Sequence, residues 1–387
     1  MFRILCEEKI PYAREAFSSL GEVSTLPVHD IVRDALRETD ILLVRSGTRI
    51  DAALLDGTPV RYVATATAGT DHVDRDYLAA RHIPFAHAPG CNADAVVEYV
   101  IAALYHLGRT KQAALAGKTI GIVGCGHVGG RLAARLPALG LNVLCCDPPL
   151  AEAGSPMALH AYEAVLEAAD ILTFHTPLVR DGAYPTYHLL DASGMQRMKP
   201  GAWLINASRG PVVDGRALEA AIDAGRFGAV VLDVWEGEPE VRLDLMRKVD
   251  LATPHIAGHS FEGKVNGTIM LYEALQQYLG MSGTWQVEDV LAPGPGDHLE
   301  LAWPAAAGEA ALHDLVHQMY DITADDRTFR TAYDLPADAQ GAFFRRLRKD
   351  YPRRRTFAMF TVAPGTQDAA TRRALRDGLR VQVSAGA

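Results

Sequence analysis

The sequence is short of cysteine and of positive charge, and both shortages exclude classes of protein. The chain of 387 residues holds only 5 cysteines, an odd number without the spacing of a zinc site. We therefore expect reduced cysteines in a cytoplasmic protein, and no metal, because His, Asp and Glu are nowhere grouped at ligand spacing. Lys and Arg number 38 against 47 Asp and Glu, and the net charge of −9 argues against nucleic-acid binding.

Long hydrophobic runs are also missing. The longest, residues 95–107, contains Glu98 and is shorter than the roughly 20 residues that a bilayer requires. Charged residues occupy positions 7–9, where a signal peptide would need an apolar core, so no membrane partner is expected. What is present, 49% hydrophobic and 22% charged residues, is typical of a globular enzyme with two or three domains.

The strongest signal in the chain is a glycine-rich turn between two apolar runs. The first run, residues 119–123, leads directly into GCGHVG at residues 124–129. A helix-compatible segment, residues 131–139, stops at Gly140, and the second apolar run ends at Asp147. Strand, turn, helix, strand and terminal acid within about 30 residues form a dinucleotide-binding fingerprint.

Each part of this fingerprint has a physical task. Gly124 permits the tight turn, Gly126 lets the backbone approach a pyrophosphate, and Gly129 lets the helix pack closely. The N–H groups of His127 and Val128, at the positive end of the helix, would then hold the phosphates.

The acid at the end of the second run indicates the cofactor. Asp147 can accept hydrogen bonds from the adenosine ribose hydroxyls and would repel a 2′-phosphate. The next residues are Pro148 and Pro149 rather than an Arg, so NAD is favoured over NADP. The alternative is an ordinary glycine-rich turn followed by a surface Asp.

Residues 1–90 resemble a small doubly wound α/β domain. Apolar, β-branched runs predict strands at residues 2–6, 41–44 and 62–65. Ligands of such sheets sit beyond the carboxyl ends of the strands. The residues predicted to share that edge are Arg45, Ser46, Thr67 and Gly69. Each of them could equally be a capping or turn residue.

The second half of the chain repeats the strand pattern. Further strands are predicted at residues 143–146, 169–174, 202–206, 229–234 and 251–253, and polar residues follow them at the same edge as Gly124. Arg209, Glu238 and His255 follow these strand ends. Arg209 could clamp a carboxylate bidentately, and His255, paired with Glu238, could take a proton from a secondary alcohol. Singly, each is a modest signal, since an isolated His or a Glu–His pair is usually structural.

Beyond residue 282 the character of the sequence changes. Residues 292–297 have the composition of a linker, and basic clusters follow at residues 345–349 and 353–355. These clusters are either the solvated face of a small α/β oligomerisation module or the source of an Arg that reaches an anionic substrate.

The order of the motifs resembles the D-isomer-specific 2-hydroxyacid dehydrogenases. The matching segments are GCGHVG, the strand-terminal Asp147, NASRG at 206–210, DVWEGEP at 233–239 and TPHIAG at 253–258. The resemblance implies an α/β fold of two doubly wound parallel-sheet (Rossmann-like) domains with a cleft between them and a small C-terminal α/β dimerisation domain. The implied boundaries are residues 1–91 with 256–284, a flavodoxin-like substrate-binding domain; 92–255, the NAD-binding domain; and 285–387.

The resemblance also implies residue roles. Arg209, Glu238 and His255 would be catalytic, and Arg45, Ser46, Thr67, Gly69 and His259 would bind substrate. NAD would be held by Gly124, Gly126, His127, Val128, Gly129, Asp147, Thr176, Ala207, Ser208, Arg209, Asp233 and Gly258. At one position the sequence departs from the family pattern, because His259 stands where the family has Tyr.

A narrower match, in residues 44–46, 66–74 and 89–92, resembles the members that use NAD to oxidise 4-phospho-D-erythronate toward pyridoxal 5′-phosphate. We therefore expect a cytoplasmic homodimer that acts on a small phosphorylated 2-hydroxy acid. Three alternatives stay open: another small 2-hydroxy acid such as 3-phosphoglycerate or glyoxylate, a non-catalytic NAD-sensing interaction protein, and formate oxidation.

Overall fold

The computed structural model describes residues 1–286, 290, 299–303, 308–363 and 368–384. The chain forms two compact units, one of residues 1–92 and 260–294 and the other of residues 93–259 and 295–387. The predicted linker at residues 292–297 lies outside the described residues. None of the described helices has the length and hydrophobicity needed to cross a bilayer.

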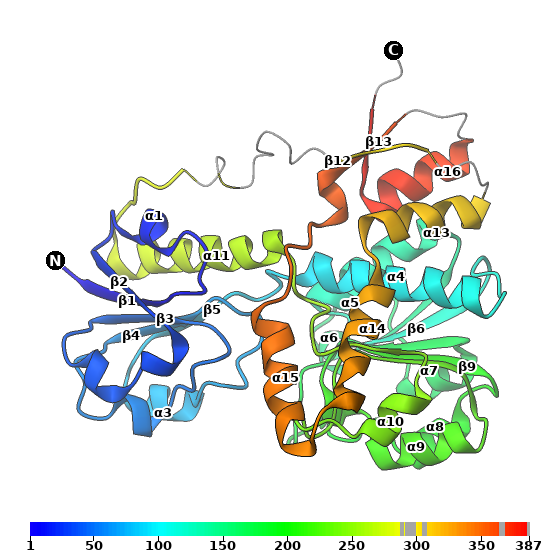
Figure 1. Ribbon diagram of the computed structural model, residues 1–387, viewed down its shortest axis with the longest axis horizontal. Coiled ribbons are helices and arrows are strands. Elements are labelled where there is room, and N and C mark those ends of the chain that lie inside the picture. The colour runs from blue at the N-terminus through cyan, green and yellow to red at the C-terminus, as the bar shows by residue number, and fades with distance from the viewer. Residues whose placement is uncertain (287–289, 291–298, 304–307, 364–367, 385–387) are drawn as a thin grey trace. The chain divides into compact units, whose positions relative to one another are not determined.

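The first unit is a five-stranded parallel sheet with helices on its faces (Figure 1). Its strand order is β2-β1-β3-β4-β5. The strands are β1 (Arg3–Glu7), β2 (Glu22–Leu26), β3 (Ile41–Val44), β4 (Tyr62–Thr65) and β5 (Phe85–His87). The helices are α1 (Ala13–Phe17), α2 (Ala52–Leu55), α3 (Arg75–Ala80) and α11 (Phe261–Leu279).

The three strands predicted in this unit are confirmed, and the two edge strands are an addition. Every residue of β3 and β4 is buried, which fits their apolar sequences, with Thr65 as the exception. The edge strands β2 and β5 are half exposed and carry no such run, so their sequences did not predict them. Helix α11 returns late in the sequence and packs Leu271, Tyr272 and Leu275 onto one face of the sheet.

The second unit contains a six-stranded parallel sheet in the order β11-β10-β9-β8-β6-β7. Its strands are β6 (Thr119–Val123), β7 (Asn142–Cys146), β8 (Ile171–Phe174), β9 (Ala202–Asn206), β10 (Phe227–Leu232) and β11 (Leu251–Ala252). Its helices up to this point are α4 (Ala93–Thr110), α5 (His127–Arg135), α6 (Pro148–Glu152), α7 (Tyr162–Ala168), α8 (Ala192–Arg197), α9 (Gly215–Asp223) and α10 (Leu243–Lys248). The predicted parallel strands are confirmed.

The helix predicted after the glycine-rich turn has two parts. It is α-helical through α5 and becomes a 3₁₀ turn at Leu136–Leu139. Gly140 then ends it with a left-handed φ of 84°, a conformation that glycine adopts without strain. The stop predicted at Gly140 is therefore confirmed.

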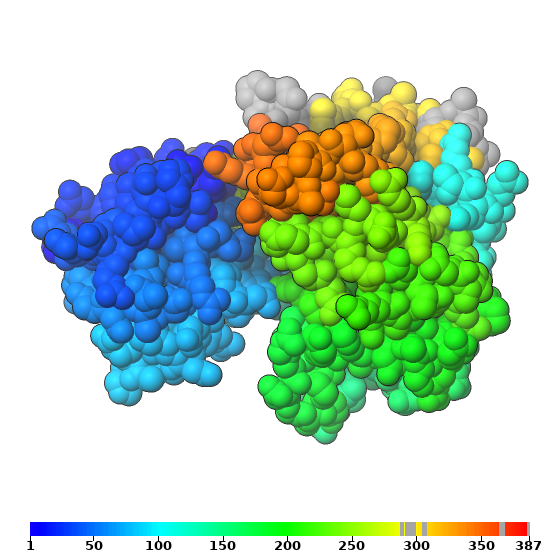
Figure 2. Space-filling model, turned by 60° about the horizontal axis from the view of Figure 1, so that its bottom comes forward, coloured from blue at the N-terminus to red at the C-terminus, as the bar shows by residue number. Residues whose placement is uncertain are grey.

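The C-terminal segment continues the second unit. It contributes β12 (Leu299–Leu301), β13 (Phe360–Val362) and β14 (Gln382–Val383), a small parallel sheet, and the helices α13 (Gly308–Met319), α14 (Ile322–Arg330), α15 (Ala337–Lys349) and α16 (Ala369–Arg373). In Figure 2, residues of this segment (orange) lie against the green part of the same unit. Arg330 donates hydrogen bonds to the carbonyls of Met246 (2.7 Å) and Val249 (2.9 Å). The separate domain predicted for residues 285–387 stays a prediction.

A buried charge cluster joins this segment to α4. Glu98 accepts a hydrogen bond of 2.8 Å from the N–H of Phe357, and Arg354 donates to the carbonyl of Ala95. Burial raises the pKa of the Glu98 carboxyl to about 8, against the lowering effects of the charges of Arg354 and Arg135. Near neutral pH the protonated form of Glu98 is therefore favoured.

We predict that Glu98→Gln flattens the pH dependence of stability. The folded-state pKa of Glu98 lies above the usual 4.5, so folded chains bind more protons than unfolded chains between about pH 4.5 and 8. The free energy of unfolding of the wild type should therefore fall as pH rises through this window, by up to about 1.4 kcal/mol per pH unit. Gln is neutral and keeps the acceptor for Phe357.

Thermal unfolding midpoints at about pH 6, 7 and 8 measure this effect. Glu15→Gln, at an exposed position, is the matched control and should keep the wild-type slope. An equal slope for Glu98→Gln and the wild type would show that Glu98 is ionised throughout.

Candidate active site

The glycine-rich turn after β6 has the geometry that a dinucleotide requires. Gly124 has a φ of 88°, and a Cβ there would lie 2.8 Å from the backbone of His175. A Cβ on Gly129 would lie 1.9 Å from the carbonyl oxygen of Gly124, so helix and turn pack without space for a side chain. Around Gly126 no atom lies within 4 Å of a Cβ, which leaves its backbone open to a pyrophosphate.

Helix α5 supplies the donors next to this opening. Gly126 is its N-cap, and His127 and Val128 are its first two residues. N–H groups in the first turn have no acceptor within the helix and lie at the positive end of the helix dipole. The arrangement fits an anionic group such as a phosphate.

Asp147 is fixed beside the same turn. It follows β7, and its carboxylate accepts hydrogen bonds from the N–H groups of Cys125 (2.8 Å) and Leu150 (3.1 Å). Each carboxylate oxygen has a second lone pair, so the group can still accept from a ribose hydroxyl.

Two buried polar atoms at the end of β8 have no hydrogen-bond partner among the described residues. They are Thr176 Oγ1 and His175 Nδ1. Burial lowers the pKa of His175 to about 3, so its ring is neutral. β6 and β8 are neighbours at the point where the strand order reverses, which is where ligands bind in such sheets. Unpartnered groups at this point fit a polar cofactor.

Hydrogen bonds of Asn206 and the close packing of Gly210 fix the turn that carries Arg209. The side chain of Asn206 accepts from the N–H (3.1 Å) and hydroxyl (2.9 Å) of Ser208 and donates to the carbonyl of Arg209 (3.0 Å). A Cβ on Gly210 would lie 2.0 Å from the carbonyl carbon of Trp235. The Arg209 turn is therefore in direct backbone contact with the loop after β10.

That loop carries the partner of the candidate base. His255 Nδ1 lies 2.5 Å from Glu238 Oε1, and the other carboxylate oxygen accepts from the N–H of Trp235 at 3.2 Å. With a carboxylate as acceptor, Nδ1 carries the proton, and Nε2 is the ring nitrogen able to accept another. The structure thus brings the predicted Glu238–His255 pair together.

A buried carboxylate fixes the loop that carries His255 by accepting hydrogen bonds from it. Asp233 is 1% exposed and accepts hydrogen bonds from the Thr253 hydroxyl (2.7 Å), the Ile256 N–H (2.8 Å) and the Ala257 N–H (2.9 Å). His255 itself has a φ of 56°, a left-handed conformation that costs about 1–3 kcal/mol. As a cofactor contact, Asp233 stays a prediction.

The carboxylate of Glu238 is charged near neutral pH. Burial raises its pKa, but the charge and hydrogen bond of His255, the N–H of Trp235 and the charge of Arg348 together lower it below the usual value. An ionised Glu238 stabilises the protonated form of the imidazole that proton abstraction would create.

Arg348 is a residue of this site that the sequence did not single out. It lies on α15, and its Nε donates to the carbonyl of His255 at 3.2 Å. Burial lowers its pKa, and among the nearby charges those of Glu238 and Asp233 raise it. The available signal is its position four residues after the core residue Phe344, on the same face of the helix.

The basic clusters do not form one solvated face. Arg345, Arg346 and Lys349 are exposed, as that alternative predicts. It is wrong for Arg354 and Arg355, which are only 7% and 8% exposed. Exposure here depends on packing against α4 and the six-stranded sheet, which composition does not reveal.

The other predicted substrate residues, apart from His259, belong to the first unit. The N–H of Arg45 donates to Glu7 Oε2 at 2.9 Å, and Ser46 is exposed beside it. The hydroxyl of Thr67 donates to the carbonyl of Gly69 at 2.8 Å. These residues follow β3 and β4 and so share the carboxyl edge of that sheet.

His259 belongs to the second unit, where its ring meets that of Tyr351 edge-on at 5.5 Å. Its N–H donates to the carbonyl of Ile256 at 2.8 Å. The ring therefore adjoins the same loop as His255.

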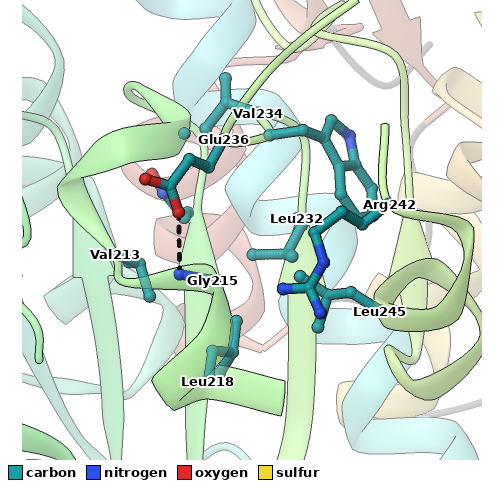
Figure 3. Close-up of a pocket in the computed structure, with 11 residues that line it drawn as sticks. Val213, Gly215, Leu218, Leu232, Val234, Glu236, Arg242 and Leu245 are labelled. Carbon is teal, nitrogen blue, oxygen red and sulfur yellow. Dashed lines mark hydrogen bonds between the residues drawn. The ribbon is translucent and has the colours of Figure 1, made fainter. Parts of the chain in front are cut away.

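Three potential metal ligands come together where the sequence spacing showed no group: His188, Asp214 and Glu236. Figure 3 shows Glu236 beside a small pocket, with one oxygen bonded to the N–H of Gly215 at 3.2 Å. The other oxygen lies 2.7 Å from His188 Nε2, the separation of a direct hydrogen bond. We therefore interpret the group as a link between the loops that follow β8, β9 and β10.

Two protein-family models match segments of the second unit. A model described as "D-isomer specific 2-hydroxyacid dehydrogenase, NAD binding domain" matches residues 102–257, which contain the dinucleotide turn, Arg209, Glu238 and His255. A second model, a domain of unknown function, matches residues 296–377.

Curated relatives match over nearly the whole chain. An erythronate-4-phosphate dehydrogenase of Salinibacter ruber is 48% identical over 98% of this chain and 99% of its own length. One of Cronobacter sakazakii is 46% identical over 95% of this chain and 96% of its own. Among solved structures, a D-lactate dehydrogenase of Aquifex aeolicus, crystallised with NAD and lactic acid, has a TM-score of 0.60 at 23% identity. It covers 72% of this chain and 95% of that chain, and shows the fold.

We predict that Asp147→Ser weakens NAD binding by about 10-fold and raises the preference for NADP relative to NAD. The variant loses a charged acceptor for the ribose hydroxyls, worth about 1.5 kcal/mol, and no longer repels a 2′-phosphate. Ser can still cap α6, so the fold should be retained. Calorimetric titration with both dinucleotides measures the change, with Asp181→Ser, at an exposed position, as the control. An unchanged NADP-to-NAD ratio would remove Asp147 from the cofactor site.

Proposed function

This chain belongs to the erythronate-4-phosphate dehydrogenases, within the D-isomer-specific 2-hydroxyacid dehydrogenase family, and we propose that it oxidises 4-phospho-D-erythronate with NAD. The product is (R)-3-hydroxy-2-oxo-4-phosphobutanoate, on the route to pyridoxal 5′-phosphate. The observation that carries the reaction type is the 2.5 Å hydrogen bond between His255 and Glu238, because the loop that carries Glu238 also contacts the Arg209 turn.

His255 is the acid–base residue in this proposal. Its Nε2 accepts the proton of the C2 hydroxyl as C2 is oxidised to a carbonyl, and the imidazolium that forms is stabilised by Glu238. The chemistry that bound NAD would supply is the acceptor for the hydride of C2. Arg348, which donates to the carbonyl of His255, helps to hold the loop in place.

Arg209 is proposed to bind the substrate carboxylate. A guanidinium can donate two parallel hydrogen bonds to a carboxylate and so fixes C2 in one orientation. The fixed turn around Arg209 supports this role, because a clamp on a rigid element positions the substrate better than one on a loose loop.

The remaining site residues enter as proposals too. Arg45, Ser46, Thr67, Gly69 and His259 bind the rest of the substrate. The residues that hold NAD are Gly124, Gly126, His127, Val128, Gly129, Asp147, Thr176, Ala207, Ser208, Arg209, Asp233 and Gly258. The open backbone at Gly126 and the buried Thr176 hydroxyl support the cofactor set.

A cytoplasmic location and a homodimer complete the proposal. All five cysteines are free and buried, which suits a reducing compartment. Dimerisation is proposed to use residues 285–387.

We predict that His255→Asn lowers kcat with 4-phospho-D-erythronate by about 10²–10⁴-fold and leaves NAD affinity near that of the wild type. Asn tolerates the left-handed backbone found at this position, so the loop should keep its conformation. His82→Asn is the matched control, since His82 is exposed and also has a positive φ, 52°.

The same assay, run with 3-phosphoglycerate, D-glycerate, D-lactate and formate, tests the substrate. Higher kcat/KM for one of these acids would keep the chemistry and replace the substrate. Tight NAD binding without turnover on any acid would favour a sensing protein.

For the assembly, we predict that sedimentation equilibrium of the intact chain gives twice the 41.8 kDa of one chain. The intact chain is required because Leu312, Leu315 and Phe357 belong to the core of the second unit, so truncation would expose that core. A mass of one chain across the micromolar range would refute the homodimer.

A further inference from the structure

Three cations gather at the carboxyl edge of the five-stranded sheet: Lys9, Arg45 and Lys264, here called the cationic cluster. We propose that this cluster binds the phosphate group of the substrate. The inference rests on the proposed function for the identity of the substrate, and it adds Lys9 and Lys264 to the residues considered so far.

Lys9 and Arg45 follow two neighbouring strands, β1 and β3. β1 and β3 pair in parallel with Ile4 opposite Ile41, so the residues that follow them emerge side by side. Arg45 Nη1 donates to the carbonyl of Lys9 at 3.4 Å. Below them the buried carboxylate of Glu7 accepts from the Arg45 N–H (2.9 Å) and from a Thr48 hydroxyl (3.0 Å), which fixes the loop.

Helix α11 delivers the third cation. A Cβ on Gly267 would lie 2.8 Å from the carbonyl oxygen of Ala66, so the helix contacts the end of β4 directly. The hydroxyl of Thr268 donates to the carbonyl of Pro11 at 2.9 Å, in the loop that also holds Lys9. Lys264 precedes Thr268 by one turn and lies on the same face. It is therefore directed to the loop of Lys9.

The charges of the cluster act on one another. Burial lowers the pKa of Lys264, and the charges of Arg45 and Lys9 lower it further. Among the residues that the structure describes, neither Lys9 nor Lys264 has an ion-pair partner. Holding like charges close together costs free energy, which a dianionic ligand offsets. Such a site is built for an anion.

The substrate explains why the anion is a phosphate. 4-Phospho-D-erythronate has a carboxylate at one end and a phosphate at the other, so it needs two anion sites. Arg209 is proposed to take the carboxylate, so the phosphate needs cations of its own, and Lys9, Arg45 and Lys264 supply them within the first compact unit. Three separate cations match the three oxygens and double charge of a phosphate better than a single carboxylate.

The test compares Lys264→Gln and Lys9→Gln on phosphorylated and unphosphorylated substrate. For each variant we expect kcat/KM with 4-phospho-D-erythronate to fall by about 10–100-fold, mainly through KM, the loss typical of one charge-assisted hydrogen bond. The loss should exceed that with D-erythronate by at least about 10-fold. Lys264→Arg should retain most of the wild-type KM. Arg49→Gln is the control, because Arg49 lies on the loop of Arg45 but pairs with Asp51.

Inorganic phosphate gives a readout that does not require turnover. Its binding constant, measured by calorimetry on the intact wild type, should weaken by a similar factor in both Gln variants, whose thermal midpoints and NAD affinity report on folding. Equal losses on both substrates would assign the cluster to the carboxylate, and no loss would remove it from the site; both outcomes overturn the inference. A wild type that binds phosphate at the cluster but does not oxidise 4-phospho-D-erythronate would refute only the proposed function.

Discussion

The buried carboxylate of Asp233 is the interaction on which the active-site loop depends. It accepts three hydrogen bonds, from Thr253, Ile256 and Ala257, and so fixes this part of the chain around the carboxylate. A hydrogen bond to a charged group is worth about 1.5–3 kcal/mol, so the three together offset the cost of the left-handed backbone at His255. The orientation of the imidazole is therefore set by the core of the second unit. A flexible loop at the surface would not hold it.

The features of the fold that depend on local interactions could be predicted from the sequence. Continuous apolar runs mark strands that are buried on both faces, and glycines mark positions where a Cβ has no space, as at Gly124 in the turn and Gly129 in α5. The edge strands β2 and β5 gave no such signal, because half of their surface faces water. The loop positions of Arg209, Glu238 and His255 followed from the order of the strands.

The remaining features depend on long-range packing, which the sequence does not reveal. That Arg348 reaches the His255 carbonyl, while Arg345 and Arg346 face solvent, depends on how α15 packs against the sheet. The same holds for Lys264, which is close enough to Arg45 and Lys9 for their charges to act on it only because α11 returns to the first unit. Helical spacing identifies a buried face, but it does not say which distant strand end lies beside it.

The return of α11 also has a consequence for synthesis on the ribosome. The face of the first sheet that buries Leu271, Tyr272 and Leu275 is complete only when residues 261–279 have emerged. At about 5–20 residues per second, the nascent sheet waits on the order of tens of seconds with that apolar face uncovered. During this interval the uncovered apolar face is a binding site for a chaperone.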